Sequence, residues 1–367
     1  MAEYKTLVKK ISISPDKKTK QKDYLKKGQL AIVDQGQRIV SGYTNDTSMS
    51  VKCDLPVIVF GDHTRAVKYI TFPFGAGADG IKILQPKENI LPLYLYYGTQ
   101  YVVAKMPNRG YARHYQYVEK EDLPIPPLSE QERIVARIEE LFSQLDACVE
   151  TLKKTKAQLA MYRQAVLKEA FEKVTIQVPL GSISESRLGK MLDKEKNVGE
   201  PRRYLRNINV RWFSFDLSDL LEMRIEDSEV DKYSLRKGDL VICEGGEPGR
   251  CAVWETDDTI FYQKALHRVR FTDFSNPKFY MYFLWYAAQT GRLKPFFTGT
   301  GIKHLTGQSL VKILVPTTDR ENQNSIVNEI ESRLSVCDSI EQTVDAALQQ
   351  AEAMRQSILK DAFEGRL

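Results

Sequence analysis

Two long segments of the chain share a repeating pattern of apolar positions. In residues 129–172 and again in residues 321–364, apolar side chains alternate at spacings of four and three, with no Pro or Gly between them. A period of 3.5 residues held over about five heptads is typical of helices that pair in a coiled coil. We therefore expect two helices of about 44 residues, each about 66 Å long at 1.5 Å per residue.

The seam is the set of positions through which the two helices are expected to pair. It comprises Ile134, Ile138, Leu141, Leu145, Cys148, Leu152, Thr155, Leu159, Tyr162 and Val166 in the first helix, and Ile326, Ile330, Arg333, Cys337, Ile340, Val344, Ala347, Ala351, Met354 and Ile358 in the second. Arg333 is the charged exception. Cys148 and Cys337 are expected to be core residues and not reactive thiols.

The two segments are also repeats of one another. A constant shift of 192 residues aligns them without a gap and pairs Gln131 with Gln323, Asp146 with Asp338 and Phe171 with Phe363. Repeated helices separated by a globular segment can fold back antiparallel, with an approximate twofold axis between them. We therefore predict an α+β fold with two mixed α/β domains, joined by two antiparallel helices that form a coiled-coil rod.

Helix-start signals divide the chain into four parts. Prolines precede Ser129, and Glu132 follows three residues later, which predicts a capping box; Thr318 and Glu321 repeat the arrangement. The predicted parts are a first domain at 1–127, a long helix at 128–173, a second domain at 174–316 and a second long helix at 317–367.

The two domain segments are similar in size and contain strand-like runs. These runs are 57–60, 81–84, 239–243 and 265–271. The run beginning at Tyr24 resembles the run beginning at Tyr233, and Arg113-His114 and Lys303-His304 each precede a proline by the same distance. Between these landmarks the two segments differ strongly.

Composition limits the possible functions only loosely. The net charge of +5 over 367 residues is modest for a DNA-binding protein, but residues 1–30 hold nine lysines against three acids. Such a segment suits either a solvated surface or a phosphate-facing one.

The five cysteines form no CxxC pair, so a reducing cytoplasm is expected, with neither a disulfide framework nor a zinc site. The apolar run 279–288 is too short to span a bilayer and predicts a buried helix.

Several segments resemble the specificity subunits of type I restriction-modification enzymes. The helix boundary 123–135 and the ending 163–171 are similar to their central conserved region, whereas 55–65 with 74–84, and 238–250 with 263–270, are similar to two classes of their target recognition domains. The second boundary, 315–323, lacks the Pro-Pro-Leu-x-Glu-Gln run.

The resemblance implies a DNA-binding protein without an active site of its own. Such a subunit binds a bipartite, asymmetric double-stranded DNA target, one half-site per recognition domain. It scaffolds two modification subunits that methylate adenine N6 and two restriction subunits that add ATP-driven translocation and cleavage. S-adenosylmethionine, ATP and magnesium would then belong to those partners, and no cofactor or metal is expected on this chain.

Candidate DNA contacts are basic side chains in the two domain segments. They are His63, Arg65, Arg113, His114, Arg202, Arg203, Arg206, Arg211, Lys303 and His304. Arginine recognises guanine with two hydrogen bonds, although most polar contacts to DNA go to phosphate. For Arg113-His114 and Lys303-His304, packing between domain and helices is an equal alternative to DNA contact.

Other chemistry is weakly supported by the sequence. Gly75, Gly77 and Gly80 match the GxGxxG pattern of dinucleotide sites, but the strand-like residues 81–84 follow where such a site needs a helix. A tight turn is therefore the favoured interpretation. A coiled-coil scaffold with two protein-binding domains is the alternative function, and salt-sensitive, sequence-selective DNA binding would separate the two.

Overall fold

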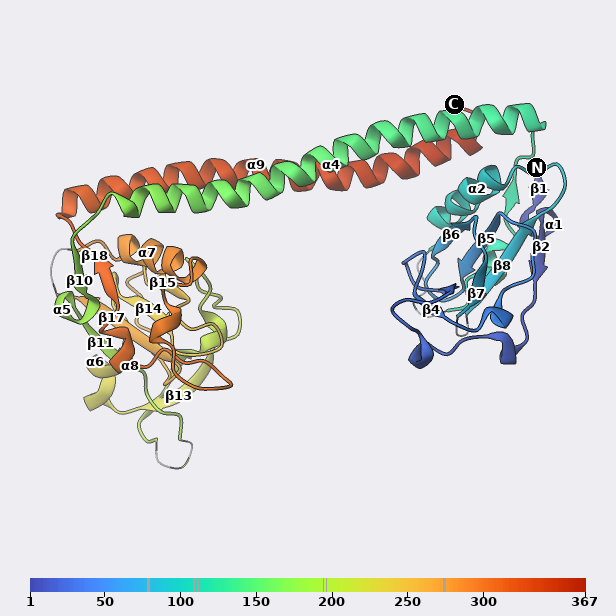
Figure 1. Cartoon of the computed structure of the whole chain (residues 1–367). Coiled ribbons are helices and arrows are strands. Elements are labelled where there is room, and N and C mark those ends of the chain that lie inside the picture. Colours follow the sequence, from blue (N-terminus) through green and yellow to red (C-terminus); the bar gives the residue numbers. More distant parts are fainter. Residues whose placement is uncertain (78–79, 108–109, 111, 194, 196, 273–274) are drawn as a thin grey trace. The chain divides into compact units, whose positions relative to one another are not determined.

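The computed structural model describes residues 1–77, 80–107, 110, 112–193, 195, 197–272 and 275–367. These residues form two compact units: unit 1 contains Met1–Lys154 with Val344–Leu367, and unit 2 contains Thr155–Thr343. The helices α4 (Leu128–Glu172) and α9 (Arg320–Phe363) each contribute one part to each unit (Figure 1). The predicted α+β class and its two long helices are therefore confirmed.

Unit 1 contains three small sheets. The largest has the order β2 (Val8–Ile11), β8 (Ile81–Pro86), β5 (Val57–Gly61) and β6 (Val67–Ile70), all antiparallel. A second sheet places β3 (Leu30–Val33) between an antiparallel β4 (Gly42–Thr44) and a parallel β7 (Phe74–Ala76). The third pairs β1 (Ala2–Glu3) with β9 (Asp122–Leu123). The helices are α1 (Tyr4–Leu7), α2 (Pro92–Lys105) and α3 (Tyr115–Val118), with 3₁₀ turns at Pro15–Lys17, Gln21–Asp23 and Thr47–Met49.

Unit 2 repeats this topology sheet for sheet. Its largest sheet has the order β11 (Ser184–Leu188), β17 (Leu266–Phe271), β14 (Leu240–Cys243) and β15 (Cys251–Val253). β12 (Glu200–Leu205) lies between an antiparallel β13 (Leu221–Ile225) and a parallel β16 (Phe261–Tyr262), and β10 (Gln177–Pro179) pairs with β18 (Leu314–Pro316). The helices are α5 (Leu180–Ile183), α6 (Val230–Tyr233), α7 (Pro277–Gln289) and α8 (Gly307–Leu310), with 3₁₀ turns at Asn207–Asn209, Asp227–Glu229 and Lys294–Phe296.

The repeated topology corrects two sequence landmarks. The run that begins at Tyr24 leads into β3, whereas the similar run at Tyr233 leads into β14, whose place in unit 1 is taken by β5. Likewise, His114 stands directly before α3, but the residue directly before α8 is Thr306 and not His304. Short similar runs therefore did not mark equivalent positions, whereas all four strand-like runs did become strands, namely β5, β8, β14 and β17.

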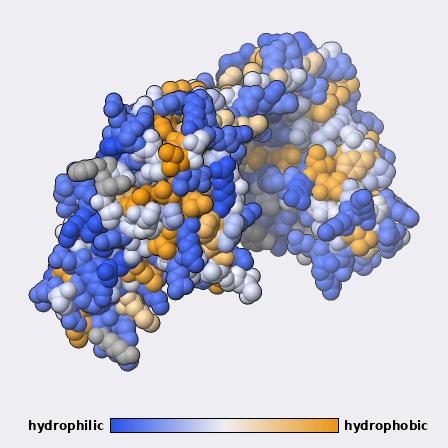
Figure 2. All heavy atoms as spheres, turned by 60° about the vertical axis from the view of Figure 1, so that its left-hand side comes forward, coloured by the Kyte–Doolittle hydropathy of each residue, from blue (hydrophilic) through white to orange (hydrophobic). Residues whose placement is uncertain are grey.

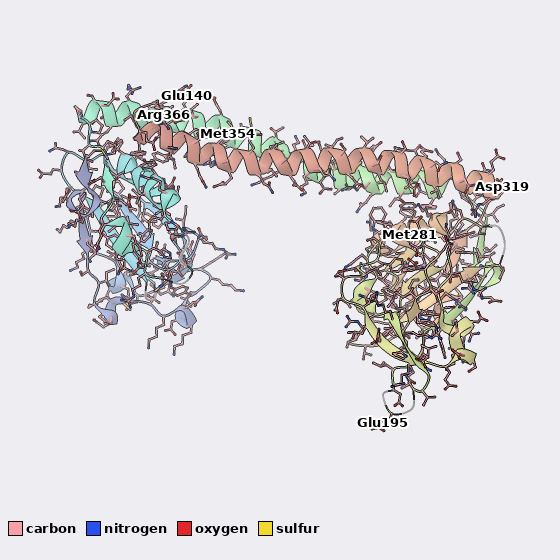
Figure 3. The ribbon with its side chains drawn as sticks, turned by 180° about the vertical axis from the view of Figure 1, so that it is seen from behind. Glu140, Glu195, Met281, Asp319, Met354 and Arg366 are labelled. Atoms are coloured by element: carbon pink, nitrogen blue, oxygen red, sulfur yellow. The ribbon has the colours of Figure 1, made fainter. Side chains whose placement is uncertain are left out.

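A mostly buried helix connects the main sheet to the long helices in each unit. In unit 2, α7 packs in one apolar cluster with β14, β15 and both long helices, and Phe171 of α4 contacts Phe279 and Phe283 at ring distances of 5.3 and 5.5 Å. Met281, buried on α7, belongs to the same cluster (Figure 3). In unit 1, α2 has this role, and Phe363 of α9 packs against Tyr94 and Tyr101 at 5.0 and 5.3 Å.

The seam differs from the prediction at four of the predicted positions. The positions Ile138, Leu145, Leu159, Val166, Ile330, Cys337, Val344 and Ala351 are buried, and Leu152 and Ile358 are half-buried. In contrast, Ile340 is 40% exposed, Met354 (Figure 3) is 47% exposed, and Tyr162 and Cys148 are exposed as well. At these four places the residue that follows, Val149, Arg163, Glu341 or Arg355, is half-buried instead, whereas the predicted Leu141, Thr155, Ile326, Arg333 and Ala347 are themselves half-buried.

Charged side chains at Arg163, Glu341 and Arg355 explain why the apolar pattern selected the residues directly before them. Arg163 donates to Asp338 and Glu341 across the helix pair at 2.5 and 2.6 Å. Its equivalent in the repeat, Arg355, pairs with Asp146 and lies 4.7 Å from the ring of Phe142. The long apolar stems of arginine can cover a seam while the charged ends reach a carboxylate, so a pattern based on apolar residues selected their neighbours instead.

Both predicted capping boxes are displaced. α4 already begins at Leu128, so Ser129 lies inside the helix, and α9 begins at Arg320, directly after Asp319. Asp319 Oδ1 accepts the backbone N–H of Asn322 at 2.9 Å, and this hydrogen bond lowers the pKa of the Asp319 carboxyl. Aspartate one residue after Thr318 is the better acceptor because its charge also suits the positive end of the helix dipole.

No helix among the residues described above combines the length and apolar character that crossing a bilayer requires.

The corrected seam predicts that the same substitution destabilises the protein strongly at one position of α9 and hardly at all at another. Val344→Asp places an unpaired charge at a side chain that is 4% exposed, and we expect it to reduce the free energy of unfolding by about 3 kcal/mol or more. Ile340→Asp is the matched control, and a change of less than about 0.5 kcal/mol is expected there. Urea unfolding monitored by circular dichroism measures both. Equal destabilisation by the two variants would contradict the seam.

Candidate functional site

The turn between β5 and β6 brings two predicted residues to the surface of unit 1. The N–H of Gly61 donates to the carbonyl of Ala66, and the N–H of Arg65 donates to that of Gly61, both at 2.8 Å. Arg65 has a left-handed backbone with φ of 60°, and its guanidinium reaches the carbonyl of Met106 at 3.4 Å. The His63 ring contacts the carbonyl of Ala112 at 3.2 Å. Both side chains are half-buried, so each retains some exposed surface.

Asp62 holds this turn against the segment that precedes α3. Its carbonyl accepts the backbone N–H of His114 at 2.8 Å and lies 3.0 Å from Nδ1 of the His114 ring. Its carboxylate accepts the N–H of Tyr115 at 2.8 Å and pairs with Lys82 at 3.3 Å. His114 is 0% exposed, so its side chain offers no surface to DNA in this conformation, and its geometry is that of packing. The neighbouring Arg113 is exposed.

Three of the four predicted arginines on β12 and its following loop are paired with aspartates in unit 2. Arg202 pairs with Asp227 at 3.0 Å, Arg206 with Asp219 at 2.6 Å and Arg211 with Asp216 at 3.6 Å. Arg203 is exposed and has no ion-pair or hydrogen-bond partner among the described residues. The strip is therefore partly neutralised by its own carboxylates, and Arg203 holds the least committed charge in it.

The loop before α8 places the remaining two predicted residues beside the β14–β15 turn. Lys303 donates to the carbonyl of Gly299 at 2.7 Å, and a Cβ on Gly245 would lie 3.1 Å from Nδ1 of His304. Asn207 donates to the carbonyl of Gly245 at 2.6 Å. Lys303 and His304 are both exposed. The structure thus brings this loop, the β14–β15 turn and the start of the 206–220 loop into one neighbourhood.

A buried histidine holds this loop in place through a hydrogen bond to its backbone. His267 of β17 is 1% exposed, and its Nε2–H donates to the carbonyl of Leu305 at 2.9 Å. The N–H of Leu305 donates in turn to the carbonyl of Glu244 at 2.7 Å. Burial lowers the pKa of His267, so the ring is held neutral.

Sequence reasoning missed the polar side chains that hold the backbone of these loops in place. Asp34 accepts from the N–H of Gly36 and the hydroxyl of Ser41 at 2.8 and 2.5 Å, and buried Lys68 donates to its carbonyl at 2.7 Å. Asn209, 1% exposed, donates to the carbonyls of Asp216 and Asp219 in unit 2. An Asx residue shortly before a glycine, as at Asp34, is a turn signal that would have identified the first of them.

The glycine run that resembles a dinucleotide site is followed by a strand. β7 ends at Ala76 and β8 begins at Ile81; Ala78 and Asp79 lie outside the described residues. Without a helix after the glycines, no helix N-terminus can face a pyrophosphate. Within the part of the chain that is described, no three His, Cys, Asp or Glu side chains gather into a group that could hold a metal ion.

Comparison with known proteins finds one recurring family. Residues 8–161 match the family described as type I restriction modification DNA specificity domain. The chain is 26% identical over 271 residues to the EcoKI specificity subunit of Escherichia coli and 27% identical over 271 residues to the StySPI specificity subunit of Salmonella potsdam, with 67% of this chain covered in both. In each case it spans only 58% of the relative's length.

Solved structures share the fold. One, from a study of complex assembly and conformational transition of the type I R-M system, has a TM-score of 0.76 at 15% identity and covers 100% of this chain and 97% of its own. The HsdS subunit from Thermoanaerobacter tengcongensis has a TM-score of 0.56 at 16% identity and covers 100% and 96%. These similarities confirm the resemblance that the sequence predicts.

The buried histidine predicts a pH dependence of stability. Because the pKa of His267 is lower in the folded chain than in the unfolded one, the unfolded chain binds a proton more readily. The stability is fully present above the ordinary histidine pKa of about 6.5 and falls with pH until the lowered folded pKa is passed, by up to about 1.4 kcal/mol per pH unit. Urea midpoints of wild type and His267→Gln between about pH 7 and 5 measure this. A parallel decline in both proteins would contradict it.

Proposed function

We propose that this relative of the type I specificity subunits recognises a bipartite, asymmetric double-stranded DNA target and carries no catalytic site of its own. Each unit would recognise one half-site. The observation that carries the proposal is that the two units repeat one scaffold. Both units have the same three sheets in the same strand order, yet the loops after β3 and β12 differ in length and sequence. A repeated scaffold with different loops suits two half-sites of different sequence.

Exposed basic side chains in unit 1 support contact with a polyanion. Lys17, Lys20, Lys22, Lys26 and Lys27 are all exposed and lie in the segment between β2 and β3. Phosphate contacts supply much of the affinity of DNA-binding proteins without sequence preference. We assign these lysines to the DNA backbone and the loop residues to the bases.

The partners follow from the same proposal. Two modification subunits would dock on the chain and methylate adenine N6 within the target, and restriction subunits would add translocation and cleavage. S-adenosylmethionine, ATP and magnesium would be bound by those subunits. Apolar side chains at the outer surface of the long helices, such as Met161 (72% exposed) and Val336 (57%), are suitable for burial against a partner.

Exchange of one domain tests the division of labour. Replacing residues 1–122 by the matching segment of another specificity subunit should change one half of the methylated sequence and leave the other half unchanged. The boundary lies just before the proline run that leads into α4, so the long helices stay intact. Methylation mapping of DNA from cells that express the chimera with its modification subunit gives the result. A change in both half-sites would refute independent recognition.

Salt dependence separates DNA recognition from a scaffold function. The purified chain with its modification subunit should bind target DNA with an affinity that falls steeply as salt rises, because bound counterions are released from phosphates. A duplex of the same length and scrambled sequence serves as the control. Its affinity for the protein should be lower than that of the target by a factor of about 1000 or more. Equal affinity for both duplexes at every salt concentration would favour the scaffold.

A further inference from the structure

We infer that the loops after β3 and β12 make the base-specific contacts, with Arg38 as a specificity residue of unit 1 and Arg211 as its counterpart in unit 2. The inference rests on the proposed function and names the residues that carry its specificity. Residues 34–41 connect β3 to β4, and residues 206–220 connect β12 to β13. Both loops leave the strand that has a parallel neighbour on one side and an antiparallel neighbour on the other. They are therefore equivalent in the repeat.

Each loop is fixed against a neighbouring hairpin turn by a side chain that bonds a backbone carbonyl. In unit 1, the hydroxyl of Thr64 in the β5–β6 turn donates to the carbonyl of Gln35. In unit 2, Asn207 donates to the carbonyl of Gly245 in the β14–β15 turn, and Arg250 of that hairpin donates back to the carbonyl of Asn207 at 3.0 Å. The loop and the turn thus form one surface in each unit.

The bases of the loops are internally braced. In unit 1, Asp34 accepts two hydrogen bonds from its own loop, and the buried ammonium of Lys68 holds its carbonyl. In unit 2, Asn209 Oδ1 accepts the N–H of Arg206 at 2.8 Å while its amide donates to two carbonyls further along the loop. Braced backbones fix the positions of the side chains that they present, and fixed side chains lose less entropy on binding.

The exposed parts of the loops present matching chemistry. In unit 1, Gln37, Arg38 and Ile39 are exposed in succession, and Ile39 is 56% exposed. In unit 2, Ile208 is 53% exposed, and Arg211 is exposed three residues later although it pairs with Asp216 at 3.6 Å. Arginine can bond guanine and glutamine can bond adenine with two hydrogen bonds each, and an apolar side chain suits the thymine methyl group. Figure 2 shows that one face of the molecule is mostly hydrophilic, with apolar patches between the hydrophilic side chains.

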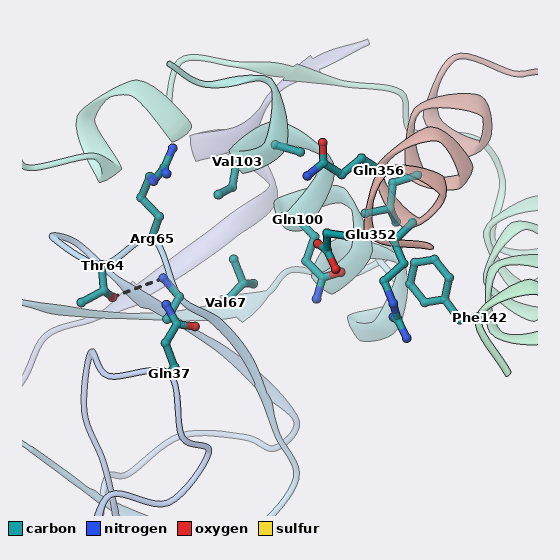
Figure 4. Close-up of a pocket in the computed structure, with 13 residues that line it drawn as sticks. Gln37, Thr64, Arg65, Val67, Gln100, Val103, Phe142, Glu352 and Gln356 are labelled. Carbon is teal, nitrogen blue, oxygen red and sulfur yellow. Dashed lines mark hydrogen bonds between the residues drawn. The ribbon is translucent and has the colours of Figure 1, made fainter. Parts of the chain in front are cut away.

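Arg38 is better suited to DNA than Arg65, one of the arginines predicted from the sequence. It has no hydrogen-bond or ion-pair partner among the described residues, whereas Arg65 already donates to the carbonyl of Met106. Gln37 and Arg65 line the same cavity of about 530 Å³ in unit 1, together with Gln100, Glu352 and Arg355 (Figure 4). Arg38 directly follows Gln37 in the chain, so the loop carries an exposed guanidinium, unpaired among the described residues, next to a residue that lines this cavity.

Methylation mapping of point variants, each expressed with the modification subunit, tests the inference. Arg38→Ala should relax the base requirement at one or two adjoining positions of one half-site, with a loss of discrimination of about 5- to 150-fold. Arg211→Ala should do the same in the other half-site. Lys27→Ala, which removes an exposed charge from the segment just before β3, is the control, and we expect weaker methylation at every site with an unchanged sequence requirement.

Arg38→Lys is a second variant that still gives a result if the alanine variant loses all methylation activity. It retains the charge but lacks the planar fork, so discrimination should fall while methylation persists. An unchanged sequence requirement in Arg38→Lys and Arg38→Ala overturns the inference and leaves the proposed function standing. Relaxation of both half-sites by Arg38→Ala overturns the inference together with the assignment of one half-site to each unit. Absence of sequence-specific methylation with the wild-type chain would instead refute the proposed function itself.

Discussion

A buried glutamine near the start of each long helix is the contact on which the arrangement of each unit depends. Gln131 is 0% exposed, and its amide accepts the N–H of Leu91 at 2.8 Å while donating to the carbonyls of Asn89 and Pro126. Gln323, 2% exposed, accepts the N–H of Asn276 at 2.7 Å and donates to the carbonyl of Thr318. Leu91 and Asn276 directly precede α2 and α7. One side chain thus sets the start of the long helix, the preceding proline segment and the helix that covers the sheet.

This constraint explains why the repeat is visible in some places and absent in others. A buried amide is costly unless its hydrogen bonds are made, so a glutamine in this position cannot change alone. The same holds for Phe171 and Phe363, which pack against α7 and α2. Residues at these contacts remain recognisable at a shift of 192, whereas the loops after β3 and β12 differ in length and sequence.

The sequence was sufficient for the architecture but not for the pairing surface or the loops. Periodicity gave both long helices because a 3.5-residue repeat has few other physical explanations. It misplaced the seam at Tyr162 and Met354, since the residues that follow them, Arg163 and Arg355, contribute apolar stems that a hydrophobicity pattern does not register. It also missed Asp34 and Asn209, because nothing local distinguishes a polar residue that braces a loop from one that faces solvent. His114 illustrates the same limit: a basic residue in a glycine-flanked segment proved to be fully buried.

The bonds that join the loops to the scaffold explain how specificity could change without loss of the fold. The N–H of His114 donates to the carbonyl of Asp62 in unit 1, and the N–H of Leu305 donates to the carbonyl of Glu244 in unit 2. In each unit the bond joins the residue directly after β5 or β14 to the segment before α3 or α8. The residues that make the bond nevertheless differ between the two units. A backbone bond is independent of side-chain identity for every residue except proline. Exposed side chains beside such bonds can therefore be substituted freely, and the geometry with which a unit presents them to a ligand is preserved.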